Sequence, residues 1–552
     1  MKTKITLSFL FLSFTFFIFS TAQGQTTTYN GSAWDNGEPT LLTDVVFTGT
    51  YISLASLTAK SVTISNNAQV TIAPGHTLTI ENNLTVTAGA KLTFENNASL
   101  IQNNPAAINT GVINYKRDAK PMLLYDFSYW SSPVANQKLV DFSPLTSAGS
   151  YFSFNADAAT NNWVNENKNN TMLPGIGYIA RSPQNFSSTT RQVFNGEFIG
   201  VPHNGDYTVN LIEHDNSVLN YNFIGNPYPS AITIDGLFDG TSIGALYIWT
   251  HNTGITNNVF TTEDYAIRTW DIGTRANSGG ETPNDFIAAG QGFFAASNAN
   301  TTFTFTNTMR VSGNNDQFFR GTQSTQGKPL SYYFWLNLTN AGGAFKQLAL
   351  GYQEKATNNF DFGVDAAAAA GTYISFYSLI GTSGYAIQGR AYPWVANDQI
   401  PLGYVSKLKD DFTITLDHNH SFFDNIDLFL YDNVVNKYHN LKSGPYTFSS
   451  EIGTFNNRFV IQYNDPTLGI EKYNPTNNSV LISHNNEVTQ IVSTSENIQS
   501  VAIYDIVGRL IYEKQNIQKN QFQVPALGVT NQTLIVKTTL VTNQSIVKKL
   551  VY

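Results

Sequence analysis

A short repeat between Leu57 and Gln102 places the strongest constraint on what this chain can fold into. Five apolar–Thr–apolar triplets and one final apolar pair recur about every eight residues: Val62–Ile64, Val70–Ile72, Leu78–Ile80, Leu84–Val86, Leu92–Phe94 and Leu100–Ile101. In an extended strand, such a triplet puts two apolar side chains on one face and the threonine on the other. A strand this short cannot bury its apolar face alone, whereas stacked copies bury their faces together.

The residues between the triplets supply corners. Asn-Asn pairs recur at about twice the triplet interval, in Ile64–Ala68, Ile80–Leu84 and Phe94–Ala98, and Pro74-Gly75 marks a further turn. Asparagine, proline and glycine favour sharp turns. We therefore predict a short β-solenoid over residues 25–114, with Trp34 covering its N-terminal end. An ordinary meander sheet is the alternative.

From Tyr115 to about Gly313 the repeat is absent, and irregular strands predict a β-sandwich domain over residues 115–313. Five segments combine aromatic residues with glycine or proline at expected strand ends: Tyr129–Pro133, Gly175–Tyr178, Phe194–Gly200, Asn222–Ser230 and Ala289–Phe294. Such a set can form an aromatic platform for a sugar ring, or it can be the core of a sandwich at its sharp turns. No carboxylate pair at fixed spacing accompanies these segments, which favours the core.

Residues 317–463 predict a second, jelly-roll-like β-sandwich. Seven apolar and aromatic segments have the length and spacing of its strands: Tyr332–Leu338, Lys346–Tyr352, Thr372–Tyr377, Tyr385–Gln388, Phe412–Leu416, Asp427–Tyr431 and Arg458–Tyr463. The stretch 464–478 contains Pro466, Gly469 and Pro475, so we predict a linker there.

Residues 479–552 predict a small immunoglobulin-like sandwich. Turn residues such as Asp505 and Pro525 separate segments that alternate with period two: Ser479–Ser483, Ser500–Tyr504, Gly508–Tyr512, Gln521–Val524, Gln532–Lys537 and Ser545–Tyr552. Within it, Val501–Leu510 carries Tyr504, Asp505, Gly508 and Arg509, and the basic pair Lys548-Lys549 precedes an apolar end.

The order of these motifs resembles the C-terminal sorting domain of cargo carried by the type IX secretion system of Bacteroidetes. The resemblance covers about the last seventy-five residues. It implies that Tyr504, Asp505, Gly508, Arg509, Lys548 and Lys549 belong to a sorting signal. It also implies export across the outer membrane with removal of the domain, and nothing about the activity of the cargo.

The N-terminus has the three parts of a secretory signal peptide. Met1–Lys4 is basic, Ile5–Phe19 is an apolar run, and Ser20–Ala22 is small. We predict a signal peptide over residues 1–22, cleaved between Ala22 and Gln23, with Gly24 as the second site. A membrane anchor is the alternative, but the run is shorter than the ~20 apolar residues of a spanning helix. We expect no transmembrane segment in the mature form.

The composition excludes several function classes. The chain has no cysteine, which excludes disulfides, thiolate metal sites and thiol nucleophiles. Charged residues make up only 13% of it, against ~25% in typical globular chains. The net charge of -8 is spread out without a basic block, so the electrostatic footprint of nucleic-acid binding is missing. A polar, weakly charged surface suits a secreted sheet protein.

Motifs that would indicate chemistry are few. The sequence has no zinc-binding histidine pair on a helix and no phosphate-binding glycine loop. Asp417-His418-Asn419-His420 holds two histidines that would share a face of a strand and so could bind a metal ion, although a solvated polar turn is favoured. Asp361–Asp365 and Asp424–Asp427 offer oxygen ligands for a structural Ca²⁺, but neither matches an EF-hand. The sequence does not exclude the facing pair of carboxylates that a glycoside hydrolase needs, because sequence alone does not fix the distance between two carboxylates.

The segment from Trp34 to Tyr463 also resembles, in order, large surface proteins of flavobacteria. Those share its Trp-Ser-Ser-Pro, Gly-Asn-Pro-Tyr-Pro-Ser and Gly-Gln-Gly-Phe-Phe elements, and the resemblance implies no activity, cofactor or site residue. We therefore predict an all-β, non-enzymatic protein, secreted or held on the outer cell surface, with a structural or adhesive role. Its expected partners are the Sec translocon, the type IX machinery and extracellular glycans or surfaces. A carbohydrate-binding or carbohydrate-active protein is the alternative.

Overall fold

The computed structural model describes residues 25–157, 162–213, 220–238, 240, 242–250, 265–276, 280–315, 329–369, 373–465, 479–485, 488–494, 496–529 and 532–552. Strands make up 52% of the structure and helices 3%, which confirms the all-β class. The chain divides into one compact unit that ends at Asn464 and a second unit, Asp465–Tyr552. The predicted cleavage site at Ala22, Gln23 and Gly24, and residues 466–478 of the predicted linker, lie outside the described residues.

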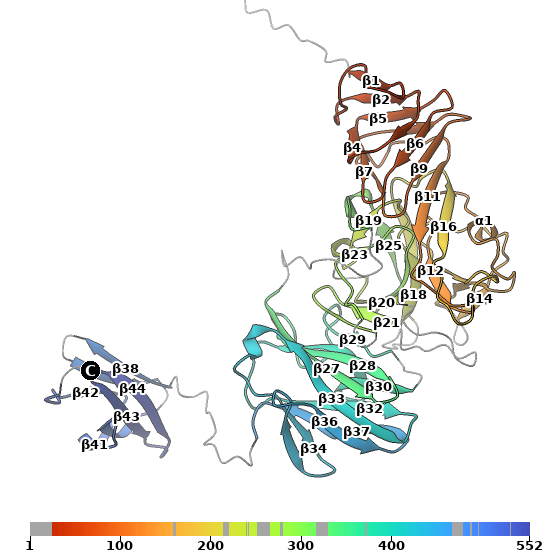
Figure 1. Cartoon of the computed structure of the whole chain (residues 1–552). Helices are drawn as coiled ribbons and strands as arrows, with labels where there is room; N and C mark the ends of the chain where they lie inside the picture. The colour runs from red at the N-terminus through yellow and green to blue at the C-terminus, as the bar shows by residue number, and fades with distance from the viewer. Residues whose placement is uncertain are drawn as a thin grey trace, which may run out of the picture. The chain divides into compact units, whose positions relative to one another are not determined.

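The repeat folds as the predicted β-solenoid, whose strands pair in parallel from rung to rung in three sheets (Figure 1). One sheet contains β1 (Thr26–Tyr29), β2 (Asp44–Phe47), β5 (Ser61–Ile64) and β8 (Leu84–Val86). A second contains β4 (Leu57–Ala59), β7 (Thr77–Ile80) and β10 (Ser99–Gln102). The third contains β3 (Tyr51–Ile52), β6 (Gln69–Ile72), β9 (Lys91–Phe94) and β11 (Ile113–Asp118), and β16 (Asn195–Gly200) closes it antiparallel.

One rung of the solenoid spans three of the sequence repeats. Val70 lies opposite Leu92 and Leu78 lies opposite Leu100, so equivalent positions are 22 residues apart. The apolar members of the triplets are buried in one core, as the alternation predicts. The corners also follow the prediction, because Asn66 and Asn97 adopt φ angles of 52° and 71°. Asparagine tolerates this left-handed conformation better than most residues.

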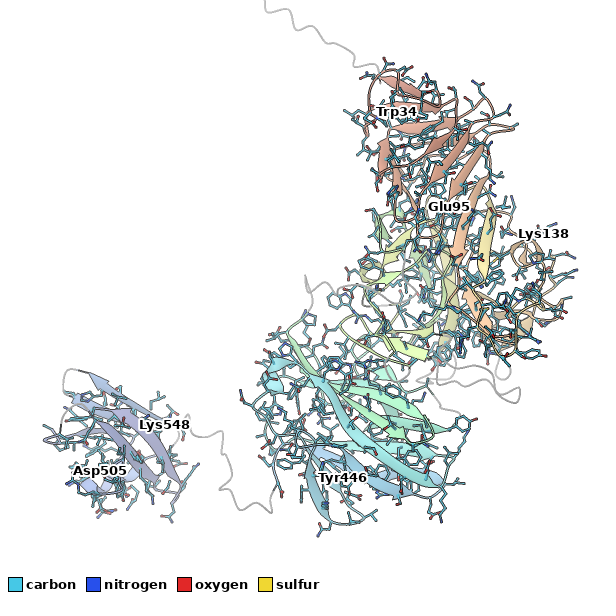
Figure 2. The ribbon with its side chains drawn as sticks, in the orientation of Figure 1. Trp34, Glu95, Lys138, Tyr446, Asp505 and Lys548 are labelled. Carbon is cyan, nitrogen blue, oxygen red and sulfur yellow. The ribbon has the colours of Figure 1, made fainter. Side chains whose placement is uncertain are left out.

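Trp34 covers the N-terminal end of the solenoid, as predicted (Figure 2). Its ring packs edge-on against Tyr29, with centroids 5.1 Å apart, and against Phe47, with centroids 5.4 Å apart. Tyr51 completes the cluster at 4.9 Å from Tyr29. Edge-to-face contacts of this kind stabilise aromatic clusters beyond the apolar area they bury.

The opposite end of the solenoid is closed by polar side chains from a distant segment. Strand β10 lies at the edge of its sheet, so the carbonyls of Ala98, Leu100 and Gln102 point away from β7 toward a rung that does not exist. Asn315 Nδ2 donates to Ala98 O at 2.6 Å, and Asn307 Nδ2 donates to Gln102 O at 2.9 Å.

Between them, Arg310 Nη2 donates to Leu100 O at 2.6 Å, while Leu100 donates its N–H to Pro229 O at 2.7 Å. Burial lowers the pKa of Arg310 to about 10, so the guanidinium keeps its proton at neutral pH. We call Asn307, Arg310 and Asn315 the polar cap. It occupies the edge that another strand would otherwise fill.

Part of the middle region continues the solenoid core, and the rest packs around a core of its own that includes Val209, Ile224 and Phe303. The predicted boundary between residues 114 and 115 falls inside β11, and Trp130, Phe142 and Phe198 join the buried cluster of the solenoid. Its elements are short: β12 (Phe127–Trp130), α1 (Leu139–Phe142), β13 (Tyr151–Phe154), β14 (Trp163–Asn165), β15 (Tyr178–Arg181), β17 (Tyr207–Leu211), β18 (Tyr221–Gly225), β19 (Ala231–Thr233), η1 (Ile234–Gly236), β20 (Ala245–Trp249), β21 (Tyr265–Arg268), β22 (Gly273–Thr274), β23 (Phe286–Ile287), β24 (Gly292–Ala296), β25 (Thr301–Phe305), η3 (Asn307–Met309) and β26 (Arg310–Val311).

The sandwich that follows is built on one eleven-stranded sheet that packs around a core of its own. Its elements are β27 (Ser331–Asn340), β28 (Phe345–Gln353), β29 (Ala366–Ala367), β30 (Ile374–Ile380), β31 (Ser383–Ala391), β32 (Gln399–Ser406), β33 (Asp410–Asn419), η4 (Ser421–Phe423), β34 (Phe429–Asp432), β35 (Lys437–Asn440), β36 (Tyr446–Ser450) and β37 (Gly453–Gln462). Pairing is antiparallel except between β28 and β31. Each of the seven predicted segments overlaps a strand of this sheet, and Thr372 of the third segment lies outside the described residues.

The middle region and the sandwich share a second buried interface. Tyr247, Phe223 and Phe294 pack in one cluster with Tyr333 and Ile387 of the sandwich. Hydrogen bonds cross the same interface, from Tyr247 Oη to Ala367 O at 3.0 Å and from Trp335 Nε1 to Gly273 O at 2.9 Å. The solenoid, middle region and sandwich are therefore joined through continuous packing.

The C-terminal unit is a two-sheet sandwich with a separate core. One sheet holds β38 (Val480–Asn485), β39 (Val488–Ser493) and β42 (Gln521–Val524), and the other holds β40 (Ile498–Asp505), β41 (Leu510–Lys519), β43 (Thr533–Leu540) and β44 (Ser545–Val551). Strand β39 was not predicted, because two of its three inward residues, Thr489 and Ser493, are polar. Within the described ranges of the whole chain, no helix combines the length and apolar character needed to cross a membrane.

We predict that replacing Asn315 with alanine destabilises the first unit by about 2–3 kcal/mol, because Ala289 N–H loses its buried acceptor and Ala98 O loses a donor. All seven tryptophans precede residue 395, so tryptophan fluorescence during urea unfolding reports this unit alone. Asn433→Ala is the control, since it removes an exposed amide-to-carbonyl bond of 2.9 Å and is expected to cost less than about 1 kcal/mol. Equal effects of the two substitutions would contradict the role of the polar cap.

Candidate functional site

The sequence-predicted residues Asp505, Gly508 and Arg509 form one tight turn between β40 and β41. Asp505 Oδ1 accepts hydrogen bonds from the N–H groups of Val507 at 3.1 Å and Arg509 at 2.9 Å. Arg509 Nε contacts Asp505 Oδ2 at 3.1 Å, and Gly508 adopts a φ of 86° that favours glycine. The N–H bonds from Arg509 and Val507, with the Arg509 guanidinium, hold the pKa of Asp505 below its usual value.

This turn presents apolar side chains to solvent. Ile506 is 72% exposed and Val507 is 85% exposed, while the carboxylate of Asp505 beneath them is buried. Tyr504 precedes the turn and lies between Leu510 and Ile535 across the sheet, half-buried on the outer face. Exposed branched residues at a turn are unusual unless they contact a partner.

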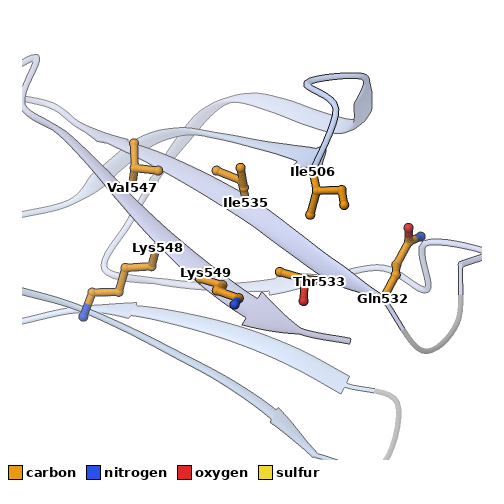
Figure 3. Close-up of a pocket in the computed structure, with 7 residues that line it drawn as sticks. All are labelled: Ile506, Gln532, Thr533, Ile535, Val547, Lys548 and Lys549. Atoms are coloured by element: carbon orange, nitrogen blue, oxygen red, sulfur yellow. The ribbon is translucent and has the colours of Figure 1, made fainter.

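Lys548 and Lys549 lie on the terminal strand beside this turn, although more than forty residues separate them in sequence. Lys549 is opposite Ile535, and Lys548 is opposite Val536. Together with Ile506 from the turn they line an open depression of about 740 Å³ (Figure 3). Its seven lining residues are Ile506, Gln532, Thr533, Ile535, Val547, Lys548 and Lys549. We call this surface the lysine depression.

The lysine depression is suited to recognition rather than to catalysis. On β44, Lys549 shares the outward face with Val547, whereas Lys548 lies on the alternate face with Ile546 and Leu550. The lining combines cationic and apolar residues with one amide and one hydroxyl, and none of the seven residues is acidic. A partner surface that complements it carries carboxylates around an apolar contact. The structure thus brings together two parts of the predicted signal, the turn after Tyr504 and the lysine pair.

The sequence predicted the two lysines of this site and missed its other lining residues, among them Gln532 and Thr533. The places of Ile535 and Val547 depend on which face of each strand is outward, which follows from the pairing of β43 with β44. The sequence does offer one indication of an apolar contact surface here: Ile506 and Val507 are branched apolar residues at positions where turn residues are expected.

The two histidines considered as metal ligands make different contacts. The His418 ring stacks on Trp335 with centroids 4.1 Å apart, and its Nδ1 contacts Asp417 Oδ2 at 2.5 Å. His420 Nδ1 accepts the N–H of Phe422 at 3.1 Å and so caps η4. Within the described residues, no group of three or more His, Asp and Glu side chains is placed to hold a metal ion.

Asp417 itself joins the sandwich to the middle region. It pairs with Arg275 at 2.9 Å and accepts from Asn337 Nδ2 at 2.9 Å. Burial acts to raise the pKa of Asp417, but the hydrogen bonds from His418 and Asn337 and the charge of Arg275 outweigh it and lower the pKa. The ionised carboxylate of Asp417 therefore links the sandwich to the middle region.

The carboxylates considered as calcium ligands accept hydrogen bonds from backbone N–H groups or asparagine side chains. Asp365 accepts from the N–H of Asp361 at 2.7 Å and from the N–H of Gly389 at 2.9 Å. Asp424 accepts from Asn419 at 3.0 Å, and Asp427 accepts from Asn440 at 2.8 Å. These oxygens therefore satisfy donors of the protein itself.

The aromatic segments of the middle region form core, as favoured from the sequence. Trp130, Phe198, Tyr228 and Phe293 are at most 1% exposed, and Tyr129 is 8% exposed. Trp130 packs edge-on against Phe142, with centroids 4.9 Å apart, inside the solenoid core. A platform for sugar rings needs exposed faces, so these five segments do not supply one.

Comparison with known protein families divides the chain at nearly the same place as its packing. Residues 21–463 match a family described as a domain of unknown function, DUF8693, and residues 468–552 match another domain of unknown function, DUF8694. No curated protein matches the chain. The gap between the two matches includes the boundary between the two compact units, which falls between Asn464 and Asp465.

We predict a pH dependence of stability from Asp365. Burial raises the pKa of Asp365 to about 7 from 3.8, so the folded state binds this proton more tightly than the unfolded state. The stabilising contribution is full below pH 3.8 and is lost as the pH rises to about 7, at no more than ~1.4 kcal/mol per pH unit.

The stability of the wild type relative to Asp365→Asn should therefore fall between pH 5 and pH 8 in urea unfolding followed by tryptophan fluorescence, because asparagine is neutral at every pH and does not titrate. Asp411→Asn, which removes an exposed carboxylate of the same sandwich, is the control. A wild-type stability that stays constant or rises relative to Asp365→Asn across this range would count against the assignment.

Proposed function

We propose that this chain, which belongs to the DUF8693 family, is a sheet-built structural or adhesive protein of the cell exterior that carries its export label in a separate C-terminal unit. The single observation that carries the proposal is the independence of residues 465–552. They have a core of their own and form a compact unit. A label that is read and then removed has to fold apart from its cargo.

The expected route supports the same conclusion. The basic and apolar segments at residues 1–22 predict entry through the Sec translocon. The resemblance of residues 479–552 to type IX sorting domains supplies the second step, across the outer membrane. The lysine depression is the surface that we assign to recognition in that step, because it unites Ile506 of the Asp505 turn with Lys548 and Lys549.

The first unit has the character of an extracellular scaffold. Its polar surface is built mainly from Asn, Thr and Ser, with 13% charged residues over the chain. Its three parts are joined by buried packing and by the polar cap, which favours a rigid body over hinged domains. A carbohydrate-binding function is the second candidate, and a surface that favours it is described below.

Deleting residues 477–552 is expected to leave the protein in the periplasm of a Bacteroidetes strain with an active type IX system. The intact chain should appear in the medium or on the cell surface, since it keeps the label. Immunoblots of periplasm, cell surface and medium measure the distribution. Equal export of the deleted and intact chains would remove the basis for the sorting function.

A finer test reverses the charge of the lysine depression. The double variant Lys548→Glu, Lys549→Glu should lower the exported fraction by about tenfold, the effect of losing ~1.4 kcal/mol of binding free energy. Lys514→Glu, Lys519→Glu is the matched control, because these exposed lysines lie on β41 and do not line the depression. Export that falls equally in both variants would show a general charge effect instead of a recognition surface.

A further inference from the structure

Four aromatic side chains from three separate segments meet at one end of the sandwich. Tyr332 comes from β27, Tyr392 and Trp394 follow β31, and Phe422 belongs to η4. The rings of Tyr332 and Phe422 stack with centroids 4.3 Å apart and planes 17° apart. Tyr392 lies 5.7 Å from Tyr332, and Trp394 lies 6.2 Å from Phe422. We call these four residues the aromatic patch.

The aromatic patch is more exposed than the aromatic segments of the middle region. Tyr392 is 36% exposed and the other three rings are half-buried, whereas the aromatic segments of the middle region are buried. Val395, at 49%, and Leu330, at 45%, extend the apolar surface beside it. Contiguous exposure of this kind marks a contact surface more often than a core.

The aromatic patch is held in place from below. Trp394 packs edge-on against Tyr463, with centroids 5.3 Å apart, and Tyr463 is only 5% exposed. The Tyr352 hydroxyl donates to Asp398 at 2.7 Å and contacts the Tyr463 hydroxyl at 3.0 Å, and Arg390 pairs with the same Asp398. The rings therefore form a pre-arranged surface, which lowers the entropic cost of binding.

Hydrogen-bond donors surround the rings. Because His420 Nδ1 accepts the N–H of Phe422, the ring proton of neutral His420 lies on Nε2. The His420 ring is 5.1 Å from the Tyr332 ring, and the residue is exposed. The hydroxyls of Tyr332 and Tyr392 hydrogen-bond to one another beside Glu354, and each keeps further capacity to bond a ligand hydroxyl. Beneath the patch, Arg390 and Asp398 form an ion pair.

We propose that the aromatic patch binds a sugar ring of a neutral polysaccharide. A pyranose has an apolar C–H face and a rim of hydroxyl groups. The C–H face matches an aromatic ring, and the rim matches donors such as His420 Nε2 and the two tyrosine hydroxyls. This ligand class goes beyond the proposed function, and it gives the extracellular scaffold a surface to which it attaches.

The sequence analysis did not single out this patch, because its members are spread over ninety residues. Tyr392-Pro393-Trp394 is the only local signal, an aromatic pair in a turn where strand β31 ends. Tyr332 and Phe422 join it only through the pairing of β27 with β33, which brings the start of β27 beside the end of β33.

The test uses the purified chain from residue 23 to its C-terminus in native gels that contain laminarin, xylan, glucomannan or hydroxyethyl cellulose. We expect at least one gel to retard the wild type, and Tyr392→Ala to weaken that association about tenfold. Tyr392→Phe should keep most of the retardation, since it keeps the ring. Tyr373→Ala is the matched control, because Tyr373 is 38% exposed on the same sandwich and lies outside the patch.

Each outcome decides the proposal. Retardation that is lost in Tyr392→Ala and retained in Tyr373→Ala, with unchanged tryptophan-monitored unfolding, supports it. No retardation in any gel overturns it, as does retardation that survives in Tyr392→Ala. Sedimentation that shows a dimer dissolved by Tyr392→Ala also overturns it, because the patch would then bind a second copy. Purified protein is used throughout, so a failure of export would leave this result unaffected.

Discussion

The last rung of the solenoid ends in a row of buried backbone carbonyls, and the rest of the first unit depends on how they are satisfied. A solenoid has an open edge at each end, and an unpaired edge either binds another strand or costs free energy. Here Asn315, Arg310 and Asn307 donate in turn to Ala98, Leu100 and Gln102. These donors come about two hundred residues later in the chain, so the solenoid is complete only when the middle region has folded onto it. The aromatic cluster around Trp34 closes the other end with apolar contacts instead.

This dependence explains why the chain divides where it does. The solenoid shares a core with the middle region, and the middle region shares a core with the sandwich, so the first natural boundary falls after Asn464. Beyond it, residues 465–552 bury their own apolar side chains between two sheets. The family matches divide at the same place, between residues 463 and 468. A rigid scaffold joined to a self-contained terminal unit is the arrangement that a removable label requires.

Local patterns predicted much of this fold, and contacts between distant segments account for what they missed. The apolar–Thr–apolar triplets predicted the solenoid because strands this short bury their apolar faces when they are stacked. The Asn-Asn pairs that contain Asn66 and Asn97 predicted its corners. Asp505 and Gly508 were found because tight turns favour those residue types, and Arg509 was predicted from the resemblance to sorting domains. The polar cap was missed because Asn307 and Asn315 look like ordinary loop residues. The lysine depression was predicted only in part and the aromatic patch was not predicted, because Ile535 and Phe422 reach their places only through strand pairing.

Unfolding of residues 25–464, compared with that of residues 25–552, tests the central claim most directly. Tryptophan fluorescence follows the first unit in both chains, because every tryptophan lies before residue 395. The account predicts the same urea midpoint and the same slope with and without residues 465–552. A chain that aggregates or unfolds at a lower urea concentration when these residues are removed would show that the terminal unit is part of the scaffold's fold, and that would contradict its assignment as a detachable label.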